Sequence, residues 1–78
     1  MTPKLLDVVV LTHDLPAEEL REGDLGAIVE IHIPDAFLVE FVAASGRTQA
    51  LVRLTPADVR SVADNDLVAV RSIAARAS

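Results

Sequence analysis

The residues best suited to chemistry are two histidines, each with an aspartate nearby in the sequence: His13 with Asp14, and His32 with Asp35. An imidazole beside a carboxylate can act as a general base or help to hold a metal ion. A metal site needs three or four converging ligands, and nothing in this spacing forces a third ligand toward either histidine. We therefore expect both histidines to be solvated or hydrogen-bonded surface residues.

Nucleophilic catalysis is the second chemistry that the residue types allow. A catalytic serine must lie beside a base, commonly on a sharp turn between a strand and a helix. No such motif surrounds any of the serines Ser45, Ser61, Ser72 and Ser78. The sequence therefore predicts a protein that is not an enzyme, with no cofactor, no metal ion and no identifiable small-molecule substrate.

The segment Gly23-Asp24-Leu25-Gly26 superficially matches the G-x-x-G loop with which KH domains clamp a nucleotide backbone. A loop that grips phosphates should be basic, whereas this one carries an aspartate. The formal net charge is −5, and the two phenylalanines are the only aromatic residues. Neither a basic stripe nor stacking rings are available, so we expect no binding to nucleic acids or anionic membranes.

Composition indicates a single small domain with more aliphatic surface than it can easily bury. The chain has 78 residues, of which 51% are hydrophobic, and it has no cysteine. The absence of cysteine fits a cytoplasmic location, and no apolar run is long enough to cross a membrane. A domain of this size buries only about 60% of its unfolded surface, so we expect self-association or a protein partner.

The elements that must position these residues are mostly strands. Runs of aliphatic and alternating residues predict strands at 5–12, 27–33, 36–43, 48–54 and 59–62. Pro16 to Arg21 fits a helical turn or a meandering loop equally well. Four residues are expected to shape turns: Gly23, Asp24, Gly26 and Gly46.

Five strands with a helical turn at 55–58 before the last one predict a mainly β fold, a small SH3-like antiparallel barrel spanning residues 1–63. Residues 64–78 are richer in alanine and form an extension. A helix from Asp66 to about Arg76 is favoured there, and a sixth strand from Leu67 to Ser72 is the alternative.

The outer face of the predicted sheet is unusually aliphatic. An exposed sheet face should be polar, yet alternation places six aliphatic residues on it. Together with two residues of the extension, these are the expected partner-binding residues: Val9, Leu11, Ile28, Leu38, Val42, Leu51, Leu67 and Val70.

Several segments, taken as a set, resemble a family of small bacterial proteins defined only as a domain of unknown function. The resemblance covers about residues 4–62 and rests on Lys4–Leu11, Asp14–Pro16, Gly23–Val29, Val39–Phe41, Gly46–Thr48 and Ala50–Val52. It implies an SH3-like barrel similar to that of the nitrile hydratase β subunit, and some members of the family lie near genes of toxin–antitoxin or immunity type, which is genomic context only. It implies no activity and no catalytic residue.

Two functions are consistent with these observations. The first is a non-enzymatic protein-binding or oligomerising module, for example an antitoxin or immunity-type partner protein. The second is an accessory subunit or maturation factor of a nitrile hydratase-like enzyme, which rests on analogy of fold alone.

Overall fold

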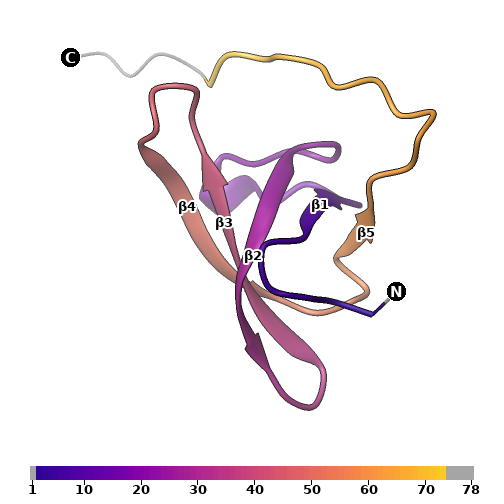
Figure 1. Ribbon diagram of the computed structural model, residues 1–78. Coiled ribbons are helices and arrows are strands. Elements are labelled where there is room, and N and C mark those ends of the chain that lie inside the picture. The colour runs from indigo at the N-terminus through magenta and orange to yellow at the C-terminus, as the bar shows by residue number, and fades with distance from the viewer. Residues whose placement is uncertain (1, 74–78) are drawn as a thin grey trace.

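The computed structural model describes residues 2–73, which form one antiparallel sheet with a single short 3₁₀ turn (Figure 1). The elements are β1 (Val8–Leu11), η1 (Pro16–Glu18), β2 (Leu25–His32), β3 (Ala36–Val42), β4 (Thr48–Leu54) and β5 (Val59–Ser61). Their order across the sheet is β4-β3-β2-β1-β5. The prediction of a mainly β fold with five antiparallel strands is therefore confirmed.

The prediction of a barrel is wrong in one respect, because the sheet does not close. β4 and β5 are its two edges, and no ladder joins them within residues 2–73. β5 contains only three residues and pairs with β1.

The core lies on the inner face of this sheet. Every strand contributes to it, and Leu20, which follows η1, covers one end. Its buried members are Val9, Leu11, Leu20, Ile28, Phe37, Val39, Phe41, Ala50, Leu54 and Val59. The predicted inward positions on β3 and β4 are confirmed for Phe37, Val39 and Phe41, and for Ala50 and Leu54. The alternation of residues predicts the inward positions correctly on these two strands, because polar residues on each of them mark the opposite, solvent-facing side.

Val9, Leu11 and Ile28 were expected on the outer face and are instead fully buried in the core. β1 reads Val-Val-Val-Leu, so no polar residue marks which side faces water. In β2 the register shifts between Ile28 and Glu30, because Val29 is an extra residue relative to β3. This bulge puts Ile28 and Glu30 on opposite faces, although they lie two positions apart.

Gly26 was expected in a turn but lies within β2, opposite Val9. The absence of a side chain at this buried position allows close packing, because a Cβ there would lie 2.5 Å from Val39 Cγ1. The turn before β2 depends on Gly23, whose φ of 93° lies in the region that favours glycine. Gly46, with φ of 91°, shapes the β3–β4 hairpin.

The predicted C-terminal helix is absent from residues 62–73, and no sixth strand forms there. This segment, which we call the strap, leaves β5 and runs as extended chain toward the β3–β4 hairpin (Figure 1). Ion pairs hold it at Asp66 and Arg71, and β-branched Val68 and Val70 favour extended backbone over helix. The end of the predicted helix lies outside the described residues. Within 2–73, no helix has the length and apolarity needed to cross a bilayer.

Candidate functional site

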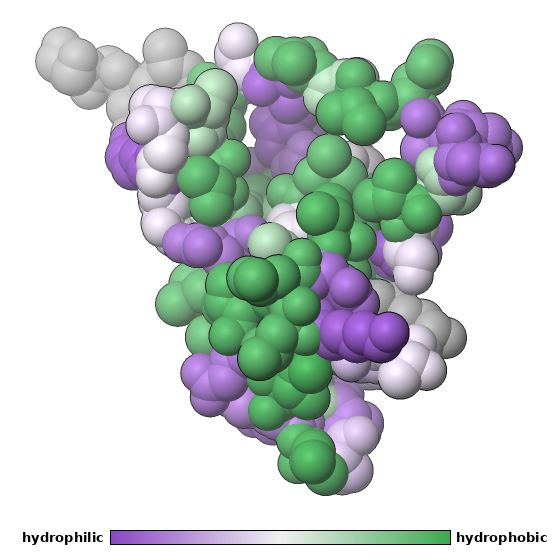
Figure 2. Space-filling model, in the orientation of Figure 1, coloured by the Kyte–Doolittle hydropathy of each residue, from purple (hydrophilic) through white to green (hydrophobic). Residues whose placement is uncertain are grey.

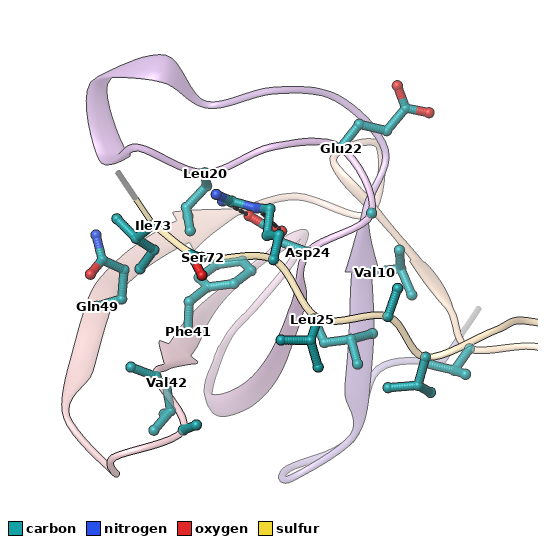
Figure 3. Close-up of a pocket in the computed structure, with 18 of the residues that line it drawn as sticks. Val10, Leu20, Glu22, Asp24, Leu25, Phe41, Val42, Gln49, Ser72 and Ile73 are labelled. Atoms are coloured by element: carbon teal, nitrogen blue, oxygen red, sulfur yellow. Dashed lines mark hydrogen bonds and ion pairs between the residues drawn. The ribbon is translucent and has the colours of Figure 1, made fainter. Parts of the chain in front are cut away.

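A groove of about 910 Å³ lies between the strap and the sheet. Val10, Leu25 and Val42 line it from the sheet, and Phe41 and Leu20 close it near the hairpin end (Figure 3). Val10 and Leu25 are paired across β1 and β2. The groove is therefore mostly apolar on the side of the sheet, while the strap forms its other wall.

One end of the strap is fastened by Arg60 of β5. Its guanidinium donates to both oxygens of Asp66, at 2.8 and 3.0 Å. The backbone N–H of Ala63 also donates to Asp66, at 2.7 Å. The bonds from Arg60 and then from Ala63 lower the pKa of Asp66 to about 2. This aspartate is therefore ionised at all ordinary pH values and fixes the turn that begins the strap.

The other end is fastened by Arg71 to the carboxylate of Asp24. Arg71 Nε donates to Asp24 Oδ1 at 2.8 Å, and Arg71 Nη2 donates to the second oxygen and to the backbone carbonyl of Glu19. The bonds from Arg71 lower the pKa of Asp24, although partial burial opposes that shift. The side chain of Asp24 is only 18% exposed. The Arg71–Asp24 pair is therefore less exposed to solvent than the Arg60–Asp66 pair.

Asp24 is positioned by the domain itself. Its Oδ2 accepts the backbone N–H of Arg21 at 2.8 Å, while its own N–H donates to the Arg21 carbonyl. Gly23 N–H donates to the carbonyl of Leu11, which ties the turn to β1. The carboxylate is therefore held at the groove by contacts that do not involve the strap, and its chemistry suits a guanidinium.

Between its two fastenings the strap packs poorly. The side chains of Leu67 and Val70 are 95% and 97% exposed, and Val68 is also exposed. Leu67 and Val70 were predicted to bind a partner, and the structure places both at the surface. Ion pairs, and not apolar burial, hold this part of the strap in place.

The outer face of the sheet carries a second group of exposed aliphatic residues. A row of neighbours in register crosses four strands, and we call it the outer row: Val8, Ala27, Glu40 and Leu51. Val8 and Leu51, at its ends, are 52% and 54% exposed. Of the other predicted binding residues, Val42 is exposed and Leu38 is half-buried. Sequence reasoning missed Val8 and Leu25, because β1 has no polar marker and the glycine-rich segment was interpreted as a turn.

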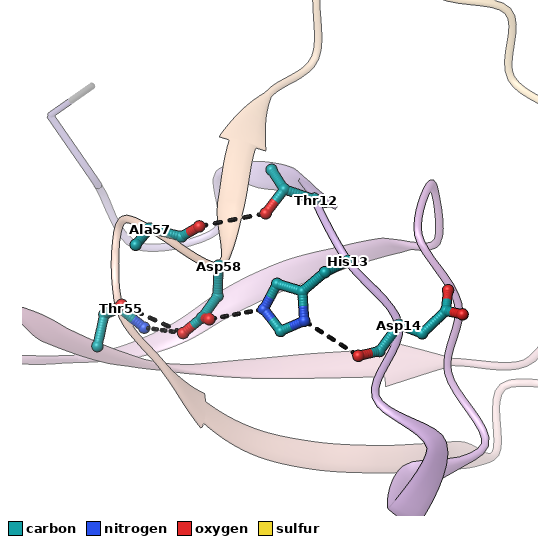
Figure 4. Close-up of polar contacts among 6 residues, drawn as sticks. All are labelled: Thr12, His13, Asp14, Thr55, Ala57 and Asp58. Carbon is teal, nitrogen blue, oxygen red and sulfur yellow. Dashed lines mark hydrogen bonds and ion pairs between the residues drawn. The ribbon is translucent and has the colours of Figure 1, made fainter.

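His13 joins the loop after β1 to the turn between β4 and β5 (Figure 4). Its Nε2 lies 2.8 Å from Asp58 Oδ1, and its Nδ1 lies 3.0 Å from the carbonyl of Asp14. Asp58 Oδ2 accepts the backbone N–H and the hydroxyl of Thr55. The hydrogen bond to Asp58 raises the pKa of His13, and the same bond lowers the pKa of Asp58.

We expect this pair to make folding stability depend on pH. Because the pKa of His13 is raised, its contribution is complete below the ordinary value of 6.5 and is lost as pH rises through the raised pKa. Because the pKa of Asp58 is lowered, its contribution is complete above 3.8 and is lost as pH falls through the lowered pKa. Thermal unfolding should therefore show a larger difference between the wild type and His13→Gln at pH 5.5 than at pH 8.5. An equal difference at both values would show that the ion pair adds nothing.

His32 lies apart from this pair and contacts Glu30, with Nε2 2.6 Å from Oε1. The contact joins two neighbours on the outer side of β2 and brings in no further ligand. Residues 2–73 contain no group of three or more histidine and acidic side chains that could hold a metal ion.

Of three comparisons with known proteins, one gives a match. A family model described as a domain of unknown function, DUF4926, matches residues 5–61, well over half of the chain. Neither the curated proteins nor the solved structures gave a match. The matched region contains all five strands, Asp24 and the outer row, and it ends where β5 ends, before the strap begins. The chain thus belongs to the DUF4926 family.

Proposed function

We propose that the protein is a non-enzymatic protein-binding module that associates through the outer face of its sheet, and that an antitoxin or immunity-type partner protein is one concrete form of it. The observation that carries this proposal is the outer row, in which exposed Val8 and Leu51 flank Ala27 and Glu40. Leu25 and Val42 lie beside it and are also exposed. Figure 2 shows hydrophobic side chains gathered over the middle of the visible face, near β2 and β3, and along the strap.

The size of this aliphatic surface supports the proposal. Apolar area that is removed from water contributes roughly 25 cal/mol per Å², so covering a few hundred Å² is worth several kcal/mol before association costs. Contiguous exposed apolar patches on small proteins commonly mark interaction sites. The openness of the sheet favours the same role, because an antiparallel sheet with unpaired edges leaves backbone groups free for a partner.

Glu40 is the charged residue within this aliphatic surface. It lies in the middle of the outer row, and its Oε2 accepts the hydroxyl of Thr48 at 2.6 Å. A carboxylate surrounded by aliphatic side chains favours a partner surface that is apolar with a basic or hydrogen-bonding group at its centre. The net charge of −5 favours the same kind of partner.

Charge substitution on the outer row tests the proposal. We expect Val8→Asp combined with Leu51→Asp to abolish association, because each aspartate would have to be desolvated in the interface without a counter-charge. Both positions are more than half exposed, so the variant should fold normally. Light scattering over a range of concentrations measures the mass, and circular dichroism checks the fold.

Ile33→Asp is the matched control, because Ile33 is 90% exposed at the β2–β3 turn and is not part of the outer row. It should associate as the wild type does. A wild-type protein that stays monomeric and whose outer row stays solvated in every complex it forms would refute the proposed function.

A further inference from the structure

We propose that the groove under the strap is a binding site for an extended, aliphatic, arginine-bearing peptide segment of a partner protein. In this structure the strap occupies the arginine position of that site in cis and so regulates access to it. The inference rests on the proposed protein-binding function and names the chemistry that one part of the surface recognises.

The first observation is a carboxylate prepared for a guanidinium. Asp24 is oriented by Arg21 N–H and by the turn at Gly23, all within the region shared with the family. Arg71, which fills this position, lies in the strap, outside that region. The carboxylate of Asp24 therefore belongs to the family domain, whereas the guanidinium of Arg71 that binds it belongs to the strap, which follows that domain. A second arginine on an extended chain could make the same two-pronged contact.

The second observation is the incomplete fit of the strap. It is held to the domain at Asp66 and Arg71, while Leu67, Val68 and Val70 between these two points remain largely exposed to solvent. The volume of about 910 Å³ that stays open beneath it is in the range of ligand sites, roughly 300–1,000 Å³. A partner segment that placed aliphatic side chains on Leu25 and Val42, which are both exposed, would make apolar contacts that the strap does not make.

The third observation is the charge at the end of the groove where Arg71 binds. The backbone N–H of Glu22 donates to Asp14 Oδ1 at 2.8 Å, which brings a second carboxylate close to the turn that carries Asp24. The side chain of Glu22 itself points away from Asp24 (Figure 3). The backbone carbonyl of Glu19 adds an acceptor for the guanidinium. In the present structure the cation bound at this end is Arg71, which donates to Asp24 and to the Glu19 carbonyl. A partner would have to supply an equivalent cation in its place.

The site would then be controlled by competition. A partner segment must displace Arg71 before it can reach Asp24, so its apparent affinity is reduced by the fraction of molecules in which the strap is released. The strap carries the pattern Val-Ala-Val-Arg-Ser-Ile at 68–73, and this pattern is the template for the segment that we expect to bind.

The test uses a fluorescently labelled peptide with the sequence of residues 62–73, titrated into full-length protein and followed by anisotropy. The receptor variant Arg71→Ala frees Asp24 and should bind the peptide at least about tenfold more tightly than the wild type. A peptide with alanine in place of its arginine should lose about tenfold or more in affinity for this variant. Adding Asp24→Asn to the receptor should cause a similar loss, while thermal unfolding confirms that each variant is folded.

Each result either supports or overturns the inference. Equal peptide affinity for the wild type and Arg71→Ala, or undiminished affinity after Asp24→Asn, would overturn it. A concentration-dependent dimer of the wild type that needs both Asp24 and Arg71 would assign the groove to a second copy of this chain and would also overturn it. If the peptide does not bind while Val8→Asp with Leu51→Asp still abolishes association, this inference fails and the proposed function stands.

Discussion

Replacing Phe37 with alanine is expected to lower the free energy of unfolding by about 3–5 kcal/mol. Phe37 is the largest fully buried side chain, and its backbone pairs with Ile31 on β2 and with Leu54 on β4. It therefore lies where three strands meet in the core. Removing its ring forfeits the transfer free energy of the buried atoms and leaves a cavity that a single curled sheet cannot readily fill.

The size of this loss matters because the whole domain is expected to have only about 4–12 kcal/mol of stability. Phe37→Ala should therefore be partly or wholly unfolded at 37 °C, as urea titration followed by circular dichroism would show. Phe37→Leu is the control, since it retains an apolar side chain and should lose clearly less. Near-equal unfolding midpoints for the alanine variant and the wild type would show that the core is not centred on this ring.

The strands could be predicted from sequence because each long aliphatic run is bounded by a glycine, a proline or an acidic turn. The inward positions on β3 could be predicted because Glu40 marks its outer face. On β1 the prediction failed, because four aliphatic residues in succession give no indication of which side faces water. On β2 it failed because a bulge at Val29 reverses the alternation, and bulges depend on pairing with another strand.

The candidate site was less predictable, because it depends on contacts between distant residues. Asp24 and Arg71 are 47 positions apart, and no local pattern connects them. The tail reads as an amphipathic helix when its spacing alone is considered, since Leu67, Val70 and Ile73 lie at helical intervals. Two arginine–aspartate pairs instead fix it as extended chain, which shows tertiary contacts overriding a weak local preference.

Replacing Gly26 with alanine is expected to destabilise the protein by about 1–3 kcal/mol, although alanine is usually the better residue within a strand. A Cβ at this position would lie 2.5 Å from Val39 Cγ1 and 2.8 Å from Phe41 Cε2, and both neighbours are buried core side chains without free space. Contacts this short require the core to shift, and the cost of that shift exceeds the backbone entropy that alanine saves.

A double-mutant cycle separates this steric cause from a backbone effect. Val39→Ala removes the closer of the two obstructing atoms, so the loss caused by Gly26→Ala should be smaller in that background, with a coupling of about 0.5–3 kcal/mol. Gly46→Ala is the control, because open space surrounds Gly46 and its cost of about 1–2 kcal/mol comes from positive φ alone. That cost should not change with Val39→Ala. The free energies of unfolding are measured by urea titration. If the losses caused by Gly26→Ala and Val39→Ala simply add, the close approach between β2 and β3 is not the reason that position 26 requires glycine.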